Sequence, residues 1–154
     1  MRWWDMDYEL TIEEVESGRR RYMALLLEGD ESAAMIDRYL DCGRLFVGHV
    51  DGEAVAVCVC VAEGGDVEVK NLAVDPRYRR RGIGRRMLAH VESLYRGGRI
   101  KLGTGETPST LRFYRSCGYE YSHRIARFFT DNYPHPIVEE GVTLRDMLYL
   151  VKKL

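Results

Sequence analysis

The stretch from Arg79 to Arg85 has the residue types of an anion-binding site. In order it contains Arg79, Arg80, Arg81, Gly82, Ile83, Gly84 and Arg85. Glycines at the start of a helix let backbone N–H groups approach an anion, because no Cβ intervenes. The positive end of the helix dipole and the guanidinium groups add attraction. The stretch predicts a site the size of a pyrophosphate; the alternative is a glycine-rich turn with solvated arginines.

Two common phosphate-binding motifs do not fit this stretch. The dinucleotide fingerprint G-x-G-x-x-G would place its third glycine at Met87. The phosphate-binding pattern G-x-x-x-x-G-K-[ST] does not match either. The glycines alone therefore do not identify the anion, and the neighbouring motifs are needed to interpret the stretch.

Two further motifs flank the stretch. Leu72-Ala-Val-Asp-Pro precedes it, and Phe113-Tyr114-x-x-x-Gly118-Tyr119 follows about 30 residues later. In this order and spacing, the three motifs resemble the GNAT superfamily, the GCN5-related N-acetyltransferases. The resemblance covers Leu45 to Tyr119, and the tail looks like a bacterial branch of unassigned substrate.

The resemblance implies an α+β (α/β/α) fold. Its sheet has seven mostly antiparallel strands, with helices on both faces and one parallel strand pair that splays apart to hold acetyl-CoA. Backbone groups of Leu72, Ala73 and Val74 are implied to bind the acetyl and pantetheine amides, and amides from Arg79 to Arg85 to hold the pyrophosphate. Where many members carry Asn before the last helix, this chain has Thr107, a helix cap that reaches less far and a candidate cofactor contact.

The implied reaction is acetyl transfer to a primary amine by direct attack in a ternary complex. Tyr114 is the first candidate for general acid, because a phenol can protonate the departing thiolate. The alternative makes Tyr114 a core aromatic that anchors the cofactor sulfur. A degenerate CoA-binding sensor without turnover is the alternative function. A nucleic-acid-binding module is a third reading; it lacks an exposed aromatic platform.

Glu68 is the candidate general base, since a catalytic glutamate matches this position in histone-acetyltransferase-like members. The alternatives are a water chain, or a solvent-facing strand carboxylate paired with Lys70. Four further side chains compete on chemistry alone: His49, His123, His135 and Cys117. The histidines are suggested by their pKa. An acyl-enzyme on Cys117 is disfavoured by the direct transfer of the family.

Patterning predicts the elements that position these residues. Helical spacing predicts helices over 12–26 and 31–40. The dipeptide Asp51-Gly52 predicts a hairpin between strands 45–50 and 54–62, and the second of these has no polar face, as in a central strand. Apolar residues change parity along strand 67–74, which predicts a β-bulge over 71–73 or a fully buried strand end.

The second half of the chain is predicted in the same way. Helices are expected over 82–95, with an apolar stripe that ends at Leu94, and from Thr107-Pro108 to Cys117. Strands are expected over 100–103, 119–123 and 147–151. The connection from Ile125 to Asp146 is long for a compact domain, and long connections are often functional.

Composition bounds the class of protein. The 154 residues carry 45% apolar and 31% charged side chains, as in one globular domain over 1–154, and no window resembles a membrane span. The net charge is −1, so the chain as a whole has no attraction for nucleic acid and no such partner is expected. Six arginines nevertheless form a local basic cluster from Arg77 to Arg86. The start Met1-Arg-Trp-Trp-Asp5 does not resemble a signal peptide. Four cysteines without metal spacing indicate reduced thiols, no metal and a cytoplasmic location.

Residues in the predicted loops indicate which acceptor substrate the protein would attract. Six carboxylates in or beside predicted loops would attract a cationic amine, or are simply solvated: Glu63, Asp66, Asp131, Glu139, Glu140 and Asp146. The segment Phe128–Pro136 concentrates aromatic residues and prolines, which is typical of a homodimer contact. The acceptor is expected to be the primary amine of a small molecule or a peptide.

Overall fold

The computed structural model describes residues 9–154. The strands are β1 (Leu10–Val15), β2 (Arg44–Val50), β3 (Glu53–Glu63), β4 (Asp66–Val74), β5 (Arg99–Thr104), β6 (Glu120–Ile125), β7 (Val138–Glu139), β8 (Val142–Thr143) and β9 (Met147–Lys153). The helices are η2 (Arg19–Tyr22), α1 (Met23–Gly29), α2 (Ala33–Asp37), η3 (Pro76–Tyr78), α3 (Ile83–Leu94), α4 (Pro108–Ser116) and α5 (Phe128–Asn132).

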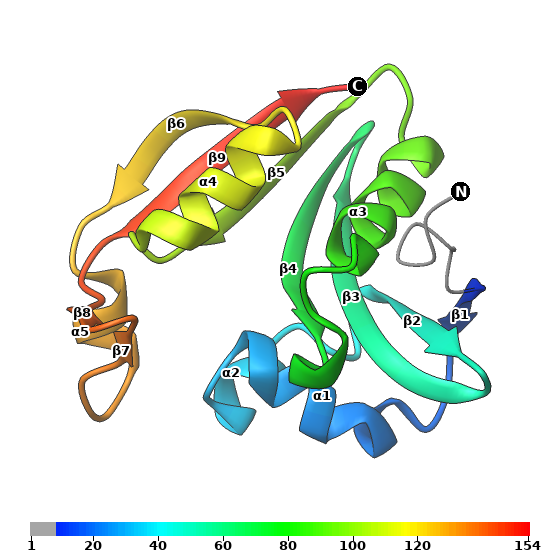
Figure 1. The fold of residues 1–154 in the computed structure, drawn as a ribbon. Helices are drawn as coiled ribbons and strands as arrows, with labels where there is room; N and C mark the ends of the chain where they lie inside the picture. Colours follow the sequence, from blue (N-terminus) through cyan, green and yellow to red (C-terminus); the bar gives the residue numbers. More distant parts are fainter. Residues whose placement is uncertain (1–8) are drawn as a thin grey trace. The chain divides into compact units, whose positions relative to one another are not determined.

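Seven strands form one sheet in the order β1-β2-β3-β4-β5-β9-β6 (Figure 1). The pairs β1–β2, β2–β3, β5–β9 and β6–β9 are antiparallel, and β4 runs parallel to β5. A small second sheet consists of β7 and β8. The predicted fold class, a mostly antiparallel seven-stranded sheet with one parallel pair, is therefore confirmed.

The chain divides into two compact units, which we describe separately. The first comprises the chain up to Val61 together with Lys70–Leu94, and the second comprises Ala62–Val69 and Tyr95–Leu154. Strand β4 contributes its first half to the second unit and its second half to the first. That residues 1–154 act as one domain stays a prediction.

The first unit contains the predicted hairpin and the predicted central strand. Asp51 and Gly52 both have positive φ, 50° and 79°, as a tight two-residue turn between β2 and β3 requires. Residues 55–60 of β3 are buried without interruption. Its valine side belongs to the main core with α1 and α2: Val15, Leu26, Ile36, Tyr39, Leu40, Leu45, Val47, Val57, Val59 and Ala73.

The small-residue side of β2 and β3 lies against α3. A Cβ added at Gly48 would stand 3.0 Å from the Met87 sulfur and 3.5 Å from the Ala56 Cβ. The prediction that small side chains admit a helix at close range is therefore confirmed, and this unit has helices on both faces of its strands. The expected apolar stripe of α3 is buried from Ile83 to Val91, whereas Leu94 is 43% exposed and does not belong to it.

The helix predicted over 12–26 is wrong in its first part. Leu10–Val15 forms β1, with Leu10 opposite Val50 and Val15 opposite Leu45. The three-residue spacing of Ile12 and Val15 suits a helix, but Thr, Ile and Val favour extended backbone, and pairing with β2 satisfies their backbone groups. Helical structure begins at Arg19.

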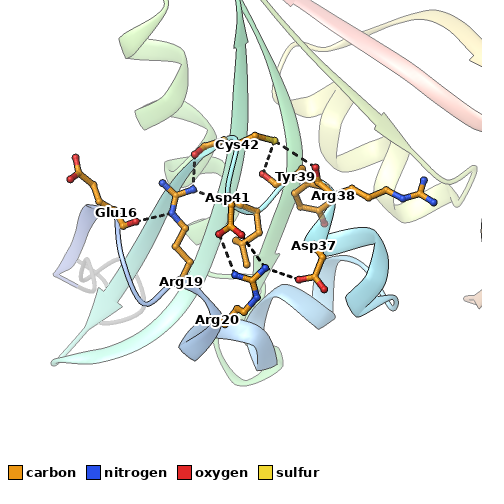
Figure 2. A network of polar contacts seen from close by, with 10 residues as sticks. Glu16, Arg19, Arg20, Asp37, Arg38, Tyr39, Asp41 and Cys42 are labelled. Atoms are coloured by element: carbon orange, nitrogen blue, oxygen red, sulfur yellow. Dashed lines mark hydrogen bonds and ion pairs between the residues drawn. The ribbon is translucent and has the colours of Figure 1, made fainter.

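The second predicted helix is shorter than 31–40, because α2 ends at Asp37 and a turn follows. Ser32 caps α2 by accepting a hydrogen bond from the Met35 amide. Figure 2 shows how Arg19 and Arg20 brace the turn after α2. The Arg19 guanidinium donates to the carbonyls of Leu40 and Gly43, at 2.5 and 2.6 Å. Arg20 forms ion pairs with the carboxylates of two aspartates: Asp37 and Asp41.

In the second unit, β9 lies between β5 and β6. The long connection 125–146 folds into α5, β7 and β8, which the sequence did not predict. Ile137 and Leu144 anchor it, since they are 4% and 5% exposed and the Leu144 amide donates to the Ile137 carbonyl. The β7–β8 turn also touches α4, because Ser109 donates a hydrogen bond to Glu140.

None of the four cysteines forms a disulfide within residues 9–154, and their reduced state stays a prediction. Cys58, Cys60 and Cys117 are buried, and Cys42 is exposed. Burial raises the pKa of the Cys58 thiol above its usual range. Within residues 9–154, no helix is long and apolar enough to cross a bilayer, and no group of three or more potential ligands is arranged to hold a metal ion. The first five residues, read as unlike a signal peptide, lie outside the described part.

Candidate active site

The arginine- and glycine-rich stretch forms a turn that leads into α3. Arg80 and Gly82 have positive φ, 63° and 77°, which glycine adopts without strain. The helical ladder begins where the Arg86 amide donates to the Gly82 carbonyl, so the amides of residues 83–85 precede its first bond. A helix of 12 residues that directly follows exposed Gly82 fits a pyrophosphate, because it offers amide donors and the positive end of a dipole.

Two of the arginines in this region are held by carboxylates. Arg77 pairs with Glu53 at 2.6 Å and with Asp75 at 2.9 Å. The hydrogen bond from Arg77 lowers the pKa of the Asp75 carboxyl. Arg79 pairs with Glu28 at 3.1 Å and donates through Nε to the Val74 carbonyl. These two side chains therefore fix the turn between β4 and α3, while the predicted role of Arg79 in the cofactor site concerns its backbone amide.

The side chains of Arg80, Arg81 and Arg85 are exposed at the mouth of α3. The Arg81 guanidinium also lies 5.4 Å from the centre of the Tyr78 ring, at cation–π distance. The turn thus brings guanidinium groups close to the amides at the start of α3, and its role as the pyrophosphate site stays a prediction.

The predicted acetyl and pantetheine contacts lie at the end of β4. Ala73 is buried, whereas Leu72 and Val74 are half-buried. The parallel register of β4 with β5 runs from Val67 opposite Ile100 to Val69 opposite Leu102. The cofactor contacts of these three residues stay a prediction, as do the splay and the β-bulge over 71–73.

Glu68 is buried in the second unit, so its interpretation as a solvent-facing carboxylate is wrong. The residue is 5% exposed. Its Oε2 accepts a hydrogen bond from the Tyr149 hydroxyl at 2.9 Å, and the Lys101 ammonium lies 3.8 Å from Oε1. Burial, followed by the charge of Glu68, raises the pKa of Tyr149. Glu68 thus has one hydroxyl donor and one nearby cation around its carboxylate, and a carboxylate is a group that can receive a proton.

Asn71 is a buried polar residue of the first unit that sequence reasoning did not single out. Its Nδ2 donates to the Leu26 carbonyl at 2.9 Å and to the Tyr39 hydroxyl at 3.1 Å. Tyr39 in turn donates to Asp30. Among residues 9–154, Oδ1 has no hydrogen-bond partner; it faces Gly29, where a Cβ would stand 2.3 Å from it. Asn71 thus ties the end of α1 to β4; the parity change along this strand was the available signal.

In the second unit, Tyr114 lies in α4 and Thr107 directly precedes that helix. Tyr114 is half-buried, and its ring meets Phe113 and Tyr119 edge to face, at 5.0 and 5.8 Å between centroids. Thr107 occupies the N-cap position of α4 and is 1% exposed. Its side chain forms no capping hydrogen bond, so the predicted cap is wrong in its chemistry, although the helix does begin at Pro108.

The three histidines and the cysteine that compete on chemistry lie in different parts of the structure. His49 lies 3.8 Å from Glu13 at the β1–β2 pair of the first unit. His123 is exposed on β6, where its ring stacks in parallel on Tyr149. His135 is exposed in the long connection. Cys117 is 8% exposed at the end of α4.

The predicted carboxylate-lined mouth is largely neutralised by cations of the second unit. Glu63 pairs with Lys101, Asp131 with Arg127, and Asp146 with Arg124. Asp66 accepts a hydrogen bond from the Arg99 amide, and Glu140 accepts one from Ser109. These contacts favour the interpretation that the acidic residues are surface charges with local partners.

Comparisons with known proteins agree with the motifs. The family model described as "Acetyltransferase (GNAT) domain" matches residues 41–121. An uncharacterized N-acetyltransferase, YvbK, from Bacillus subtilis strain 168 is 30% identical over 147 residues, which covers 92% of this chain and 95% of the relative.

Two solved structures share the fold over nearly the whole chain. A GNAT family acetyltransferase from Elizabethkingia anophelis with acetyl-CoA bound has a TM-score of 0.88 at 30% identity, covering 96% of this chain and 100% of the other. A Bacillus subtilis acetyltransferase in complex with CoA has a TM-score of 0.83 at 28% identity, covering 95% and 99%. From its motifs, its sheet and these likenesses, the chain belongs to the GNAT family of N-acetyltransferases.

Proposed function

We propose that residues 1–154 act as one domain that transfers the acetyl group of acetyl-CoA to a primary amine in a ternary complex. The observation that carries the proposal is the mouth of α3, where Gly82 has a φ of 77° and the amides of residues 83–85 precede the helical ladder. These amides, with those of residues 79–82, would hold the pyrophosphate. Two relatives with TM-scores above 0.8 bind CoA or acetyl-CoA, which supports the choice of donor.

The end of β4 would hold the rest of the donor. Backbone groups of Leu72, Ala73 and Val74 pair with the acetyl and pantetheine amides, in the manner of an added strand. Thr107 is a further candidate contact from the start of α4. Bound acetyl-CoA supplies a thioester whose carbonyl carbon can be attacked by an amine.

Glu68 acts as the general base in this proposal. An amine reaches the site largely as an ammonium ion, and only its neutral form has a lone pair. The Glu68 carboxylate takes that proton, and the nitrogen lone pair then forms the C–N bond. Burial and the Tyr149 hydroxyl support this role, because they hold the carboxylate in one orientation away from bulk water.

Tyr114 acts as the general acid. As the C–S bond breaks, the phenol donates its proton to the sulfur, so that CoA leaves as a thiol. The phenolate then takes a proton from the acylated nitrogen, which leaves a neutral amide and restores the phenol. The half-buried ring, packed edge to face between Phe113 and Tyr119, supports a fixed orientation for the hydroxyl.

The acceptor is a primary amine of a small molecule or a peptide. A cytoplasmic location is part of the proposal, and four cysteines that form no disulfide within residues 9–154 support it. So is a homodimer contact through residues 128–136, where Phe128, Phe129 and Tyr133 are grouped in space. No nucleic-acid partner is proposed.

Two substitutions test the proposal together with an amine panel read by mass spectrometry. Gly84→Glu places bulk and negative charge at the pyrophosphate, and it should abolish CoA binding in calorimetry. Tyr114→Phe should leave CoA binding intact and slow transfer by about 10- to 100-fold. Unchanged turnover would remove Tyr114 from the acid role. CoA binding without acetylation of any amine would favour the sensor.

A further inference from the structure

The hydrogen bond between Tyr149 and Glu68 joins strands that are not neighbours. Tyr149 lies on β9, Glu68 lies on β4, and β5 runs between them. Two strand spacings amount to about 10 Å, so the tyrosine must lean across β5 to bring its hydroxyl within 2.9 Å of the carboxylate. The two residues are 81 positions apart in the sequence.

Gly103 leaves the room for this side chain. It pairs directly with Tyr149 in the β5–β9 register. A Cβ on Gly103 would stand 3.2 Å from the Tyr149 Cζ and 2.3 Å from the Met147 sulfur. Any larger residue would therefore displace the ring from its path over β5.

His123 supports the other side of the ring. It pairs with Tyr149 in the β6–β9 register, and the two rings stack with centroids 4.8 Å apart and planes 2° apart. Tyr149 is thus placed by residues on both neighbouring strands, which gives its hydroxyl a fixed direction.

The charged groups around Glu68 come from several elements. Lys101 on β5 is 3.8 Å from Glu68 and 3.0 Å from Glu63 at the end of β3. Asp66 also acts on Lys101 through its charge. Lys101 is thus shared among carboxylates, whereas the Tyr149 hydroxyl donates to Glu68 at hydrogen-bond distance.

We propose that Tyr149 is a positioning residue that orients Glu68 and stabilises its charged form. The inference rests on the proposed role of Glu68 as general base. Tyr149 does not exchange its own proton with the substrate; it acts through the carboxylate. Gly103 and His123 form the support that makes this contact possible.

The test measures the titration of Glu68 directly and the pH dependence of acetyl transfer separately. Protein labelled with ¹³C at the glutamate carboxyls is titrated by NMR, and the Glu68 signal is assigned by its loss in Glu68→Gln. Tyr149→Phe keeps the stacked ring and removes the donor. The matched control is Tyr121→Phe, which removes a hydroxyl from a tyrosine on β6 that is 54% exposed.

In Tyr149→Phe we expect the NMR titration of the Glu68 carboxyl to move to higher pH, because the carboxylate loses a hydrogen-bond donor. The acidic limb of kcat/KM should move to higher pH by a similar amount, while CoA binding and the Tyr121→Phe profile stay unchanged. Gly103→Ala should shift the Glu68 titration in the same direction.

An unchanged Glu68 titration in both variants would overturn the inference. A shifted titration with an unmoved pH profile of acetyl transfer has a different meaning. It would support the contact between Tyr149 and Glu68 and would remove Glu68 from the role of base, so failure of the inference and failure of the proposed function are distinguishable.

Discussion

Glu68 and Asn71 lie three residues apart on β4, and both are buried polar side chains, yet their surroundings differ. Glu68 belongs to the second unit and receives a hydrogen bond from Tyr149. Asn71 belongs to the first unit and gives two hydrogen bonds, to Leu26 and Tyr39. Glu68 accepts a hydrogen bond, whereas Asn71 donates hydrogen bonds to a backbone carbonyl and to a side chain of its own unit.

The difference separates the proposed base from a structural tie. Glu68 has a hydroxyl donor and a cation near a carboxylate to which the proposed mechanism gives a chemical role. Asn71 carries no charge, and its amide N–H groups tie β4 to Leu26 of α1 and to Tyr39 in the turn after α2. We therefore expect changes at Glu68 to alter the reaction and changes at Asn71 to alter stability.

The largest expected effect is that of Glu68→Gln on transfer. The amide keeps the size of the side chain and an oxygen that accepts from Tyr149, but it cannot take a proton. kcat/KM should fall about 100-fold or more, while the free energy of unfolding changes by less than about 1 kcal/mol. Steady-state kinetics measure kcat/KM, and urea unfolding measures the free energy of unfolding. A variant with normal turnover would show that a water chain serves as base.

Asn71→Ala should give the converse result. The Leu26 carbonyl loses its buried donor, and Tyr39 loses one of its two partners, so the free energy of unfolding should fall by about 2 kcal/mol. The matched control is Asn132→Ala, because half-buried Asn132 also donates to a carbonyl, that of Phe128; it should cost less. The comparison breaks if folded Asn71→Ala loses as much turnover as Glu68→Gln.

Gly29→Ala tests the structural role of Asn71 in another way and should lower the free energy of unfolding by less. Its Cβ would stand 2.3 Å from the Asn71 Oδ1 and 3.2 Å from the Leu72 carbonyl oxygen. Crowding of this kind costs about 1–3 kcal/mol, from which the better helix propensity of alanine subtracts up to about 1 kcal/mol. The cost should shrink in the Asn71→Ala background. Gly65→Ala is the control, since nothing lies within 4 Å of its Cβ; equal losses in both variants would contradict the contact.

The smallest expected effect is on stability at alkaline pH. Burial raises the pKa of Tyr39, and burial with the charge of Glu68 raises that of Tyr149. Because each folded pKa lies above the unfolded value of about 10, the contribution is complete below pH 10 and is lost as the pH rises beyond it. Urea unfolding between pH 8 and 11 should therefore show a falling stability that is less steep in Tyr39→Phe. A slope that Tyr39→Phe leaves unchanged would contradict this assignment.

The sequence predicted the elements whose information is local. The Asp51-Gly52 turn, the apolar β3 and the helix after Gly82 each depend on residues that are close in the chain. The three motifs around Arg79 then identified the family before any contact was known. Local information also misled, because the spacing of Ile12 and Val15 suited a helix until β2 was available as a pairing partner.

The surroundings of Glu68 could not be predicted in this way. Its hydrogen-bond donor is 81 residues away, and the path of that donor depends on a glycine of the strand between them. The same holds for Asn71, whose partners come from α1 and from the turn after α2. Such contacts follow from strand order and register, which no periodicity of the chain reveals.

The burial of the cysteines has a practical consequence for following the reaction. Disulfide reagents that report newly released CoA also report protein thiols, and in the folded chain the exposed Cys42 is the one that meets solvent. A fresh sample should therefore show a constant background of one equivalent per chain. Unfolding should uncover Cys58, Cys60 and Cys117, so a climbing baseline would reveal denaturation during the same measurement.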